Sequence, residues 1–246
     1  MTRDTHTQPQ LSTCLSPSLL HLYDVTSSIV VIIDILRATS TIATALYNGA
    51  KNIIPVDSVA ECIKLGKQLD VIAAGERDGR IAEGLQYGNT PFQYTPSFIK
   101  GKTLVLTTTN GTRLLHMALA AGAAGIITGS FCNLSAVCDY LVAQRKNVIL
   151  ACAAWKDRVN IEDTLFAGAV ITKIKDHFVR NCDASQIAET MYQYSKDDLL
   201  GFMREKRASH YLRLMNYGLG EDIKYCLSID NANALVVYDS GRLVLG

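Results

Sequence analysis

The stretch VVIIDILRATS, residues 30–40, predicts a buried strand and indicates where a site lies. It continues an apolar, β-branched run that begins at Ile29, and such a run is typical of a strand covered on both faces of a sheet. The run stops at Asp34, and Arg37 follows three residues later. A core strand needs neither charge, so the stretch predicts a strand whose end carries functional groups.

The same order of elements occurs twice in the chain. After the first strand come a helix at 41–48 and a strand within KNIIPVDS. Further on, TLVLTTT leads into NGTRLLHMALAAGAAGIITGS, which repeats the order of strand, loop, helix and strand. We infer an internal duplication of residues 28–100 and 102–177 within one domain that spans residues 1–246.

Strands that alternate with helices predict an α/β layered fold. Because the apolar runs are continuous, we expect helices on both faces of the sheet. In such folds ligands bind at the carboxyl ends of strands, on the loops that lead into helices. The loops predicted to meet there are Asp34–Thr41, Gly75–Gly79, Thr107–Arg113 and Ala151–Asp163.

The composition is that of an ordinary globular protein, with 246 residues, 48% apolar residues and a net charge of +1. It indicates no nucleic-acid partner, and no apolar run is long enough for a membrane helix. The N-terminus lacks the apolar core of a signal peptide, so we predict a cytoplasmic protein. The seven scattered cysteines contain no C-x-x-C pair and are interpreted as apolar fillers in a reducing compartment.

Two C-terminal features complete the expected fold. Residues 183–217 predict two amphipathic surface helices, and 234–246 predict a β-hairpin that turns at Asp239-Ser240-Gly241. The five histidines lie outside every candidate loop. Neither a histidine-based triad nor a histidine-rich metal site is therefore predicted.

Asp34 can be interpreted as an ordinary turn or helix-capping residue. However, Arg37 and the hydroxyls of Thr39, Ser40 and Thr41 follow it at once. A helix N-terminus with hydroxyls and an arginine makes an anion site. An aspartate beside a bound anion would be repelled unless a cation lay between them, which suggests a divalent metal, Mg²⁺.

Two other loops repeat this logic. Glu76 and Arg77 directly follow an apolar strand in AAGERDGR, although a solvated turn would look the same. TTTNGTR (107–113) is a hydroxyl-rich turn that can expose backbone N–H groups, but it lacks the lysine of a P-loop. An ordinary Asn-Gly turn is its alternative interpretation.

The fourth loop carries two patterns. Glu162 and Asp163 lie at an expected helix start, where acidic residues are common for dipole reasons, and a carboxylate there could complete a metal shell. Cys152 and Arg158 have the C-x5-R spacing of cysteine phosphatases. The intervening AAWKD contains a bulky Trp155 and no glycine, so a nucleophilic cysteine is not favoured.

Four motifs together resemble the 2-phosphosulfolactate phosphatase family of ComB-like proteins: VVIIDILRATSTIATALYNGA, GERDGRIAEGLQYGNTP, TTTNGTR and IEDTLFAGA. The resemblance implies a three-layer α/β/α fold and a Mg²⁺-dependent phosphoric monoester hydrolase. The implied reaction converts (2R)-phosphosulfolactate to (2R)-3-sulfolactate and phosphate, a step of coenzyme M synthesis in methanogens. A homodimer is a further prediction, from the resemblance and the apolar C-terminal hairpin.

Candidate residues follow for a small substrate with three anionic groups. The catalytic candidates are Asp34, Arg37 and Glu76, and the metal candidates are Asp34, Glu76 and Asp163. The substrate-binding candidates are Arg37, Thr39, Arg77, Asn89, Asn110, Gly111 and Thr112. A covalent phosphate on Asp34 is a rival to attack by water, but Leu36 stands where haloacid-dehalogenase phosphatases carry a second aspartate.

One departure from the family pattern concerns Gln86, which occupies a position where the resemblance leads us to expect an aspartate. If that aspartate binds metal in the family, the loss bears on activity here. Two alternative functions therefore stay open. One is a phosphatase of another small phosphorylated carboxylic acid, and the other is a catalytically silent, anion-binding relative.

Overall fold

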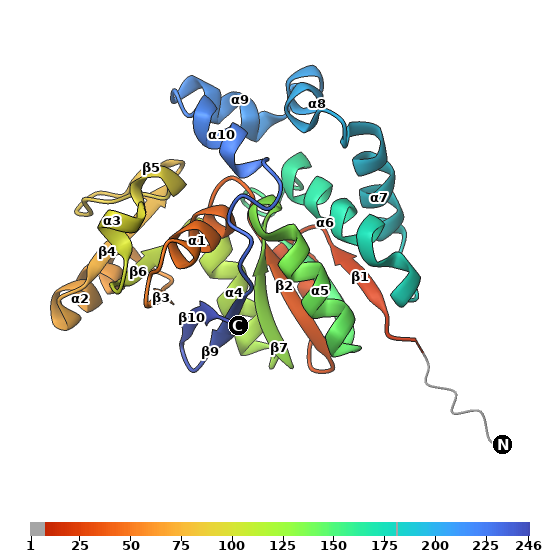
Figure 1. Ribbon diagram of the computed structural model, residues 1–246, viewed down its shortest axis with the longest axis horizontal. Coiled ribbons are helices and arrows are strands. Elements are labelled where there is room, and N and C mark those ends of the chain that lie inside the picture. The colour runs from red at the N-terminus through yellow and green to blue at the C-terminus, as the bar shows by residue number, and fades with distance from the viewer. Residues whose placement is uncertain (1–7, 181) are drawn as a thin grey trace.

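A single mixed sheet organises the protein (Figure 1). The computed structural model describes residues 8–180 and 182–246. The strands, in the order β1-β8-β2-β7-β9-β10-β3-β6-β4-β5 across the sheet, are β1 (Leu11–Cys14), β2 (Ser28–Ile33), β3 (Asn52–Pro55), β4 (Ile72–Arg77), β5 (Arg80–Ile81), β6 (Thr103–Thr107), β7 (Gly125–Gly129), β8 (Asn147–Cys152), β9 (Val236–Asp239) and β10 (Arg242–Leu245).

Helices fill most of the connections between these strands. They are α1 (Ala38–Tyr47), α2 (Val59–Leu69), α3 (Pro96–Ile99), α4 (Gly111–Ala120), α5 (Leu134–Gln144), α6 (Ile161–Ile174), α7 (Asp183–Ser195), α8 (Leu199–Glu205), α9 (Ser209–Asn216) and α10 (Gly220–Cys226). Short 3-10 helices occur at Pro17–Leu22, Pro91–Gln93, Phe131–Asn133 and Lys175–His177.

The sheet consists of two parallel blocks joined by a hairpin. One block contains β1, β8, β2 and β7, and the other contains β3, β6 and β4. The hairpin β9–β10 pairs antiparallel with β7 on one side and with β3 on the other. Since three antiparallel pairings separate β7 from β3, the two blocks run in opposite directions, which the expected α/β layered fold did not specify.

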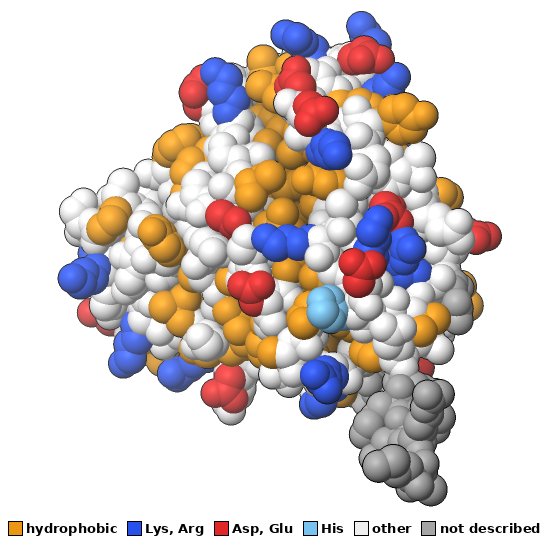
Figure 2. Space-filling model, turned by 45° about the vertical axis from the view of Figure 1, so that its right-hand side comes forward, with side chains coloured by type: hydrophobic (Ala, Val, Ile, Leu, Met, Phe, Trp, Pro, Cys, Tyr) orange, Lys and Arg blue, Asp and Glu red, His pale blue; other side chains and the backbone are white. Residues whose placement is uncertain are grey.

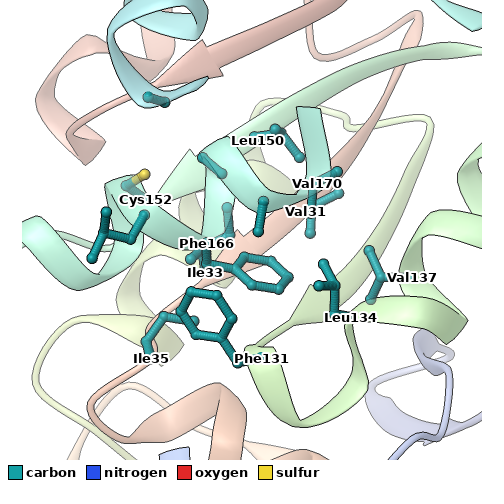
Figure 3. Close-up of a cluster of buried hydrophobic side chains, with 14 of the residues drawn as sticks. Val31, Ile33, Ile35, Phe131, Leu134, Val137, Leu150, Cys152, Phe166 and Val170 are labelled. Atoms are coloured by element: carbon teal, nitrogen blue, oxygen red, sulfur yellow. The ribbon is translucent and has the colours of Figure 1, made fainter. Parts of the chain in front are cut away.

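Helices cover both faces of the sheet, as expected for a three-layer α/β/α fold. Val31 and Ile33 of β2 pack with α5 and α6, whereas Val30 and Ile32 pack with α1 and α4. The first cluster includes Phe131 and other side chains that meet beneath α6 (Figure 3). Successive strand residues point to opposite faces, so a continuous apolar run indicates a strand buried on both sides.

The crossover helices connect the two blocks. Helix α1 leads from β2 in one block to β3 in the other, and α4 leads from β6 back to β7. The proposed repeats 28–100 and 102–177 contain β2, β3, β4 and β6, β7, β8, respectively, so β2 corresponds to β6, β3 to β7 and β4 to β8. Read outward from the hairpin, β7-β2-β8 on one side and β3-β6-β4 on the other contain corresponding strands in the same order. The duplication itself stays a prediction.

Two C-terminal expectations have different outcomes. The hairpin is confirmed, and it turns through Ser240 and Gly241, whose φ angles are both positive. It lies inside the sheet, not at a free edge, so its apolar character does not support a homodimer. The expectation of two surface helices at 183–217 is wrong, since α7, α8 and α9 lie there, and α9 covers part of the site described below.

Charges of both signs are interspersed with apolar side chains on the face shown in Figure 2, in keeping with the net charge of +1. Within residues 8–180 and 182–246, no helix has the length and apolar character needed to span a bilayer.

Candidate active site

The turn between β2 and α1 places Asp34 at the end of a buried strand. The Thr39 hydroxyl donates to the Asp34 carbonyl at 2.9 Å and accepts from the Asp34 amide at 3.2 Å. This bridge fixes the turn from both ends, and the Asp34 side chain is left only 8% exposed. Thr39 is therefore buried within the turn.

The turn between β6 and α4 uses the same bridge. The Thr112 hydroxyl donates to the Thr108 carbonyl at 3.0 Å and accepts from its amide at 3.1 Å. Gly111 begins α4 against the first turn, since a Cβ built on it would lie 2.8 Å from Asp34 Oδ2 and 3.0 Å from Ala38 Cβ. The N-termini of α1 and α4 thus meet beside Asp34, and helix N-termini favour anions.

A small, enclosed cavity lies where these turns meet. Five of the residues that the sequence predicted for the site line this cavity: Asp34, Arg37, Glu76, Asn89 and Asn110. Asn89 comes from the segment after β5, and the other four follow β2, lie near the end of β4 or follow β6. The expectation that these loops converge is therefore confirmed, although the two blocks run in opposite directions. The cavity holds about 10 Å³, which is room for one water molecule.

Arg37 lines this cavity, and it is also held by α10, which lies with α9 over the loops; these two helices are called the cover below. Its Nη1 pairs with Asp222 of α10 at 2.5 Å, and Nη2 donates to the Gly79 carbonyl at 3.1 Å. Both side chains of the ion pair are largely buried. A guanidinium has five N–H donors, so these two bonds leave donors available for a ligand.

Glu76 ends β4 with both carboxylate oxygens engaged by backbone amides. Oε1 accepts from the Thr109 amide at 2.7 Å, and Oε2 accepts from the Gly79 amide at 2.8 Å. Beside it, Asn89 Oδ1 is buried and has no hydrogen-bond partner within the described part of the chain. Two carboxylates and an unpaired amide oxygen are the hard donors that Mg²⁺ prefers, so the lining fits this ion.

Asp163 does not join these groups in the cavity. It is fully buried, and its two oxygens accept from the Ile35 amide at 2.9 Å and the Ala154 amide at 3.1 Å. No cluster of three His, Cys, Asp or Glu side chains suited to a metal occurs in residues 8–180 or 182–246. The predicted ligand set Asp34, Glu76 and Asp163 is thus assembled only in part.

Burial shapes the acidity of both aspartates. Burial and the nearby Glu76 raise the pKa of Asp34 to about 6, against the opposing influence of His210. Burial also raises the pKa of Asp163 well above its ordinary value, and Glu162 and Asp34 add to this shift.

His210 of α9 is the functional candidate that sequence reasoning missed. Its Nδ1 lies 2.5 Å from Oε1 of Glu162, a fully buried carboxylate at the start of α6. His210 lines the cavity together with Trp155 and Leu214. His210 lies outside the candidate loops, as the sequence indicated, but it still lines the cavity because α9 folds over these loops from a distant part of the sequence.

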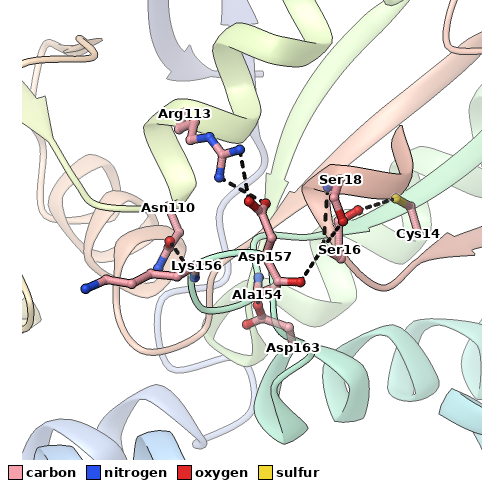
Figure 4. A network of polar contacts seen from close by, with 9 residues as sticks. All are labelled: Cys14, Ser16, Ser18, Asn110, Arg113, Ala154, Lys156, Asp157 and Asp163. Carbon is pink, nitrogen blue, oxygen red and sulfur yellow. Dashed lines mark hydrogen bonds and ion pairs between the residues drawn. The ribbon is translucent and has the colours of Figure 1, made fainter. Parts of the chain in front are cut away.

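The loop 153–160 that carries Trp155 is fixed by contacts on several sides (Figure 4). Arg113 of α4 forms two bonds to the Asp157 carboxylate, at 3.0 and 3.3 Å, and the Ser16 hydroxyl donates to the Asp157 carbonyl at 2.8 Å. Ala154, Lys156 and Asp157 have positive φ angles, which are costly for residues with side chains. The contacts hold Trp155 in place despite this backbone.

Several predicted residues lie outside the cavity. Arg77 turns to the opposite side of β4, where it donates to the Thr107 hydroxyl and the Asp57 carbonyl. Gln86 is exposed in an outer groove, so its substitution for aspartate removes no group from the cavity. Cys152 is buried in the apolar core and burial raises its pKa, which disfavours a thiolate nucleophile.

The fold and this lining define an α/β enzyme whose carboxylates, arginine and paired helix N-termini suit an anionic substrate. The profile of the 2-phosphosulpholactate phosphatase family matches residues 14–241. The chain belongs to this family of phosphoric monoester hydrolases.

Relatives in three bacteria agree with this assignment, and each is named a probable 2-phosphosulfolactate phosphatase. The protein of Caldanaerobacter subterraneus subsp. tengcongensis is 41% identical over 205 residues, which cover 82% of this chain and 83% of the relative. Those of Clostridium acetobutylicum and Thermotoga maritima are each 37% identical, over 218 and 215 residues, and cover 87% of this chain and 91% of the relative.

Proposed function

We propose that this chain is a Mg²⁺-dependent phosphatase that hydrolyses (2R)-phosphosulfolactate to (2R)-3-sulfolactate and phosphate. The observation that supports it most is the convergence of Asp34, Glu76 and Arg37 at two helix N-termini in a chain of this family. The proposal also includes a cytoplasmic location and a homodimeric state. It assigns the reaction to the sulfolactate-forming step that coenzyme M synthesis uses. The exposed position of Gln86 removes the main reason for a catalytically silent relative.

Asp34, Glu76 and Asn89 are the residues that would hold Mg²⁺, since they bring oxygen donors to one cavity. When bound, the ion supplies a positive charge that neutralises the phosphoryl group and acidifies a coordinated water. Asp163 instead holds the Ile35 amide and so fixes the turn that carries Asp34. The Arg37 guanidinium supplies further charge for the phosphoryl oxygens.

His210 is the residue that can give a proton to the leaving oxygen. Direct attack by water forms a new P–O bond and breaks the ester P–O bond. The electron pair of the broken bond stays on the sulfolactate oxygen, which takes the proton of His210, and both protons of the water leave on the released phosphate. Leu36, which stands where haloacid-dehalogenase phosphatases carry a second aspartate, also lines the cavity but cannot donate a proton. Glu162 fixes one ring nitrogen of His210 and leaves the other for this transfer, which is typically worth about 10²–10⁴-fold in rate.

Phosphate release from (2R)-phosphosulfolactate tests the proposal. We expect release in the presence of Mg²⁺, its loss in EDTA, and a decrease of about 10²-fold in Arg37→Ala. Asp222→Asn is the matched control, because it removes the ion pair on Arg37 and leaves the guanidinium in place. A folded wild-type protein that releases no phosphate, or releases it equally in EDTA, would contradict the proposal.

A further inference from the structure

Arg213 of α9 lies beside the cavity and has no ion-pair partner among residues 8–180 and 182–246. Its guanidinium carbon is 3.5 Å from the centre of the Trp155 ring, so the group stacks on the indole. Arg213 Nε and Nη2 are both buried and lack hydrogen-bond partners in the described residues. Burial lowers the pKa of Arg213, while Tyr217, Glu162, Asp78 and Glu76 oppose that shift.

The Arg213 residue is half-buried, and two of its buried donors lack hydrogen-bond acceptors in the described part of the chain. Buried donors without acceptors are costly, and a buried charge is normally paired. No carboxylate within residues 8–180 and 182–246 lies close enough to Arg213 for an ion pair, although Arg37 nearby has Asp222. Stacking on Trp155 holds the planar fork in one orientation, which favours a planar or tetrahedral oxyanion as the missing partner.

The position of Arg213 relates it to the substrate. It follows His210 and precedes Leu214 on α9, and both of these line the cavity, as does Trp155. Arg213 is therefore a second cationic group at the site, on the cover, while Arg37 is on the base. A substrate with a phosphate and two other acidic groups needs more than one such cation.

We infer that Arg213, stacked on Trp155, binds an acidic group of the substrate other than its phosphate, either the sulfonate or the carboxylate. This inference rests on the proposed function, because it assigns part of the same substrate. The cavity holds about 10 Å³, less than the substrate needs, so side chains that line it must shift for a substrate to enter. Contact of the oxyanion with Arg213 then joins the bound substrate to the cover.

Three substrates separate the possible contacts. They are (2R)-phosphosulfolactate, 2-phospholactate, in which a methyl group replaces the sulfonomethyl group, and 1-sulfopropan-2-yl phosphate, in which a methyl group replaces the carboxylate. We expect Arg213→Met to lower kcat/KM for phosphosulfolactate by about 10–10²-fold, the usual effect of a charge-assisted hydrogen bond. The analogue that lacks the bound group should lose less than about threefold, which identifies that group.

Two further variants keep the test specific. Lys206→Met is the matched control, because Lys206 also lies over an aromatic ring, Phe202, but is exposed and lines neither the cavity nor the adjoining groove that contains Arg37 and Asn89. We expect it to change kcat/KM by less than about twofold. Arg213→Lys keeps the charge but loses the stacked fork, so it should show a similar selective loss if Arg213→Met fails to fold.

Calorimetric binding of (2R)-sulfolactate, which has no phosphate, provides a readout that does not need turnover. Binding that weakens in both Arg213 variants and not in Lys206→Met would support the inference even if wild-type protein released no phosphate, and only the proposed function would then fail. Equal losses on all three substrates, or no loss with any of them, would overturn the inference while leaving an active wild-type phosphatase intact.

Discussion

Two strand-to-helix turns meet at the site, and they differ in what they present. Each is closed by a threonine hydroxyl that bridges the end of its strand, Thr39 to Asp34 and Thr112 to Thr108. The first turn presents a carboxylate and a guanidinium, whereas the second presents Asn110 and a glycine with room for Asp34 beside it. The turn between β2 and α1 thus carries the charged groups, and the turn between β6 and α4 leaves the space around them.

A similar comparison holds for the two buried carboxylates. Glu76 accepts the Thr109 amide of the second turn, and Asp163 accepts the Ile35 amide of the first. Each also accepts an amide from the loop after β4 or β8, respectively. Of the two, Glu76 lines the cavity and Asp163 does not, so the same bonding pattern reaches the cavity in one block and only fixes the backbone in the other.

The largest expected difference lies between Asp34 and Asn110. Asp34→Asn should lower kcat by about 10³-fold or more, because it removes the charge in the first turn. Asn110→Ala should lower kcat by only about tenfold, because Asn110 accepts a long hydrogen bond from the Lys156 amide and carries no charge. Steady-state phosphate release measures both, and equal losses would break the comparison between the turns.

The two carboxylates should separate stability from activity. Asp163→Ala leaves two buried amides without acceptors and should cost about 2–4 kcal/mol of unfolding free energy. Glu76→Ala should cost less, since its loop is closer to solvent, but should lower kcat more. Urea unfolding and phosphate release on the same preparations test this, and Asp163→Asn, which keeps one acceptor, is the matched control. An Asp163→Ala protein as stable as wild type would refute the positional role.

Acidity makes a third difference between the turns. Since the pKa of Asp34 is about 6 in the folded chain and about 3.9 in unfolded peptides, the folded state binds more protons between these values. The stability from this group is present below about pH 4 and is lost as pH rises through 6. In EDTA at pH 7.5, Asp34→Asn should therefore be more stable than wild type by about 1–3 kcal/mol.

The control for this effect is Asn110→Ala, which removes no titrating group. Its stability difference from wild type should stay constant with pH in urea unfolding, whereas that of Asp34→Asn should shrink toward pH 4. A constant difference for Asp34→Asn would show that burial does not disfavour its charge.

Sequence alone could predict the turns because each signal is local. An apolar run that stops at a charged or hydroxyl residue marks the end of a strand, and this signal led to the prediction of Asp34, Glu76 and Asn110, all of which line the cavity. The same logic wrongly included Arg77 as a cavity residue, although the two-residue period of a strand puts neighbours on opposite faces. That signal was present in the sequence.

Other features depend on contacts between distant segments. His210, Arg213 and Asp222 lie on short helices whose polar pattern is that of a surface, and only folding brings them over the loops. The insertion of β9–β10 between the blocks depends on strand pairing. No local pattern specifies such a partner, and so neither the cover nor the reversal of direction was predicted.

The smallest expected effect tests whether the two turns are equivalent scaffolds. Thr39→Val and Thr112→Val keep the shape of the side chain and remove the hydroxyl bridge, so each should cost about 1–2 kcal/mol of unfolding free energy. Thr190→Val, at an exposed position of α7, is the matched control. Because Thr39 holds the turn that presents Asp34, its variant should also lower kcat by about tenfold, whereas Thr112→Val should change kcat less. If instead both variants lowered kcat equally at equal cost in stability, the second turn would position reacting groups as directly as the first. The special role of the first turn would then come from the charges of Asp34 and Arg37 and not from its backbone.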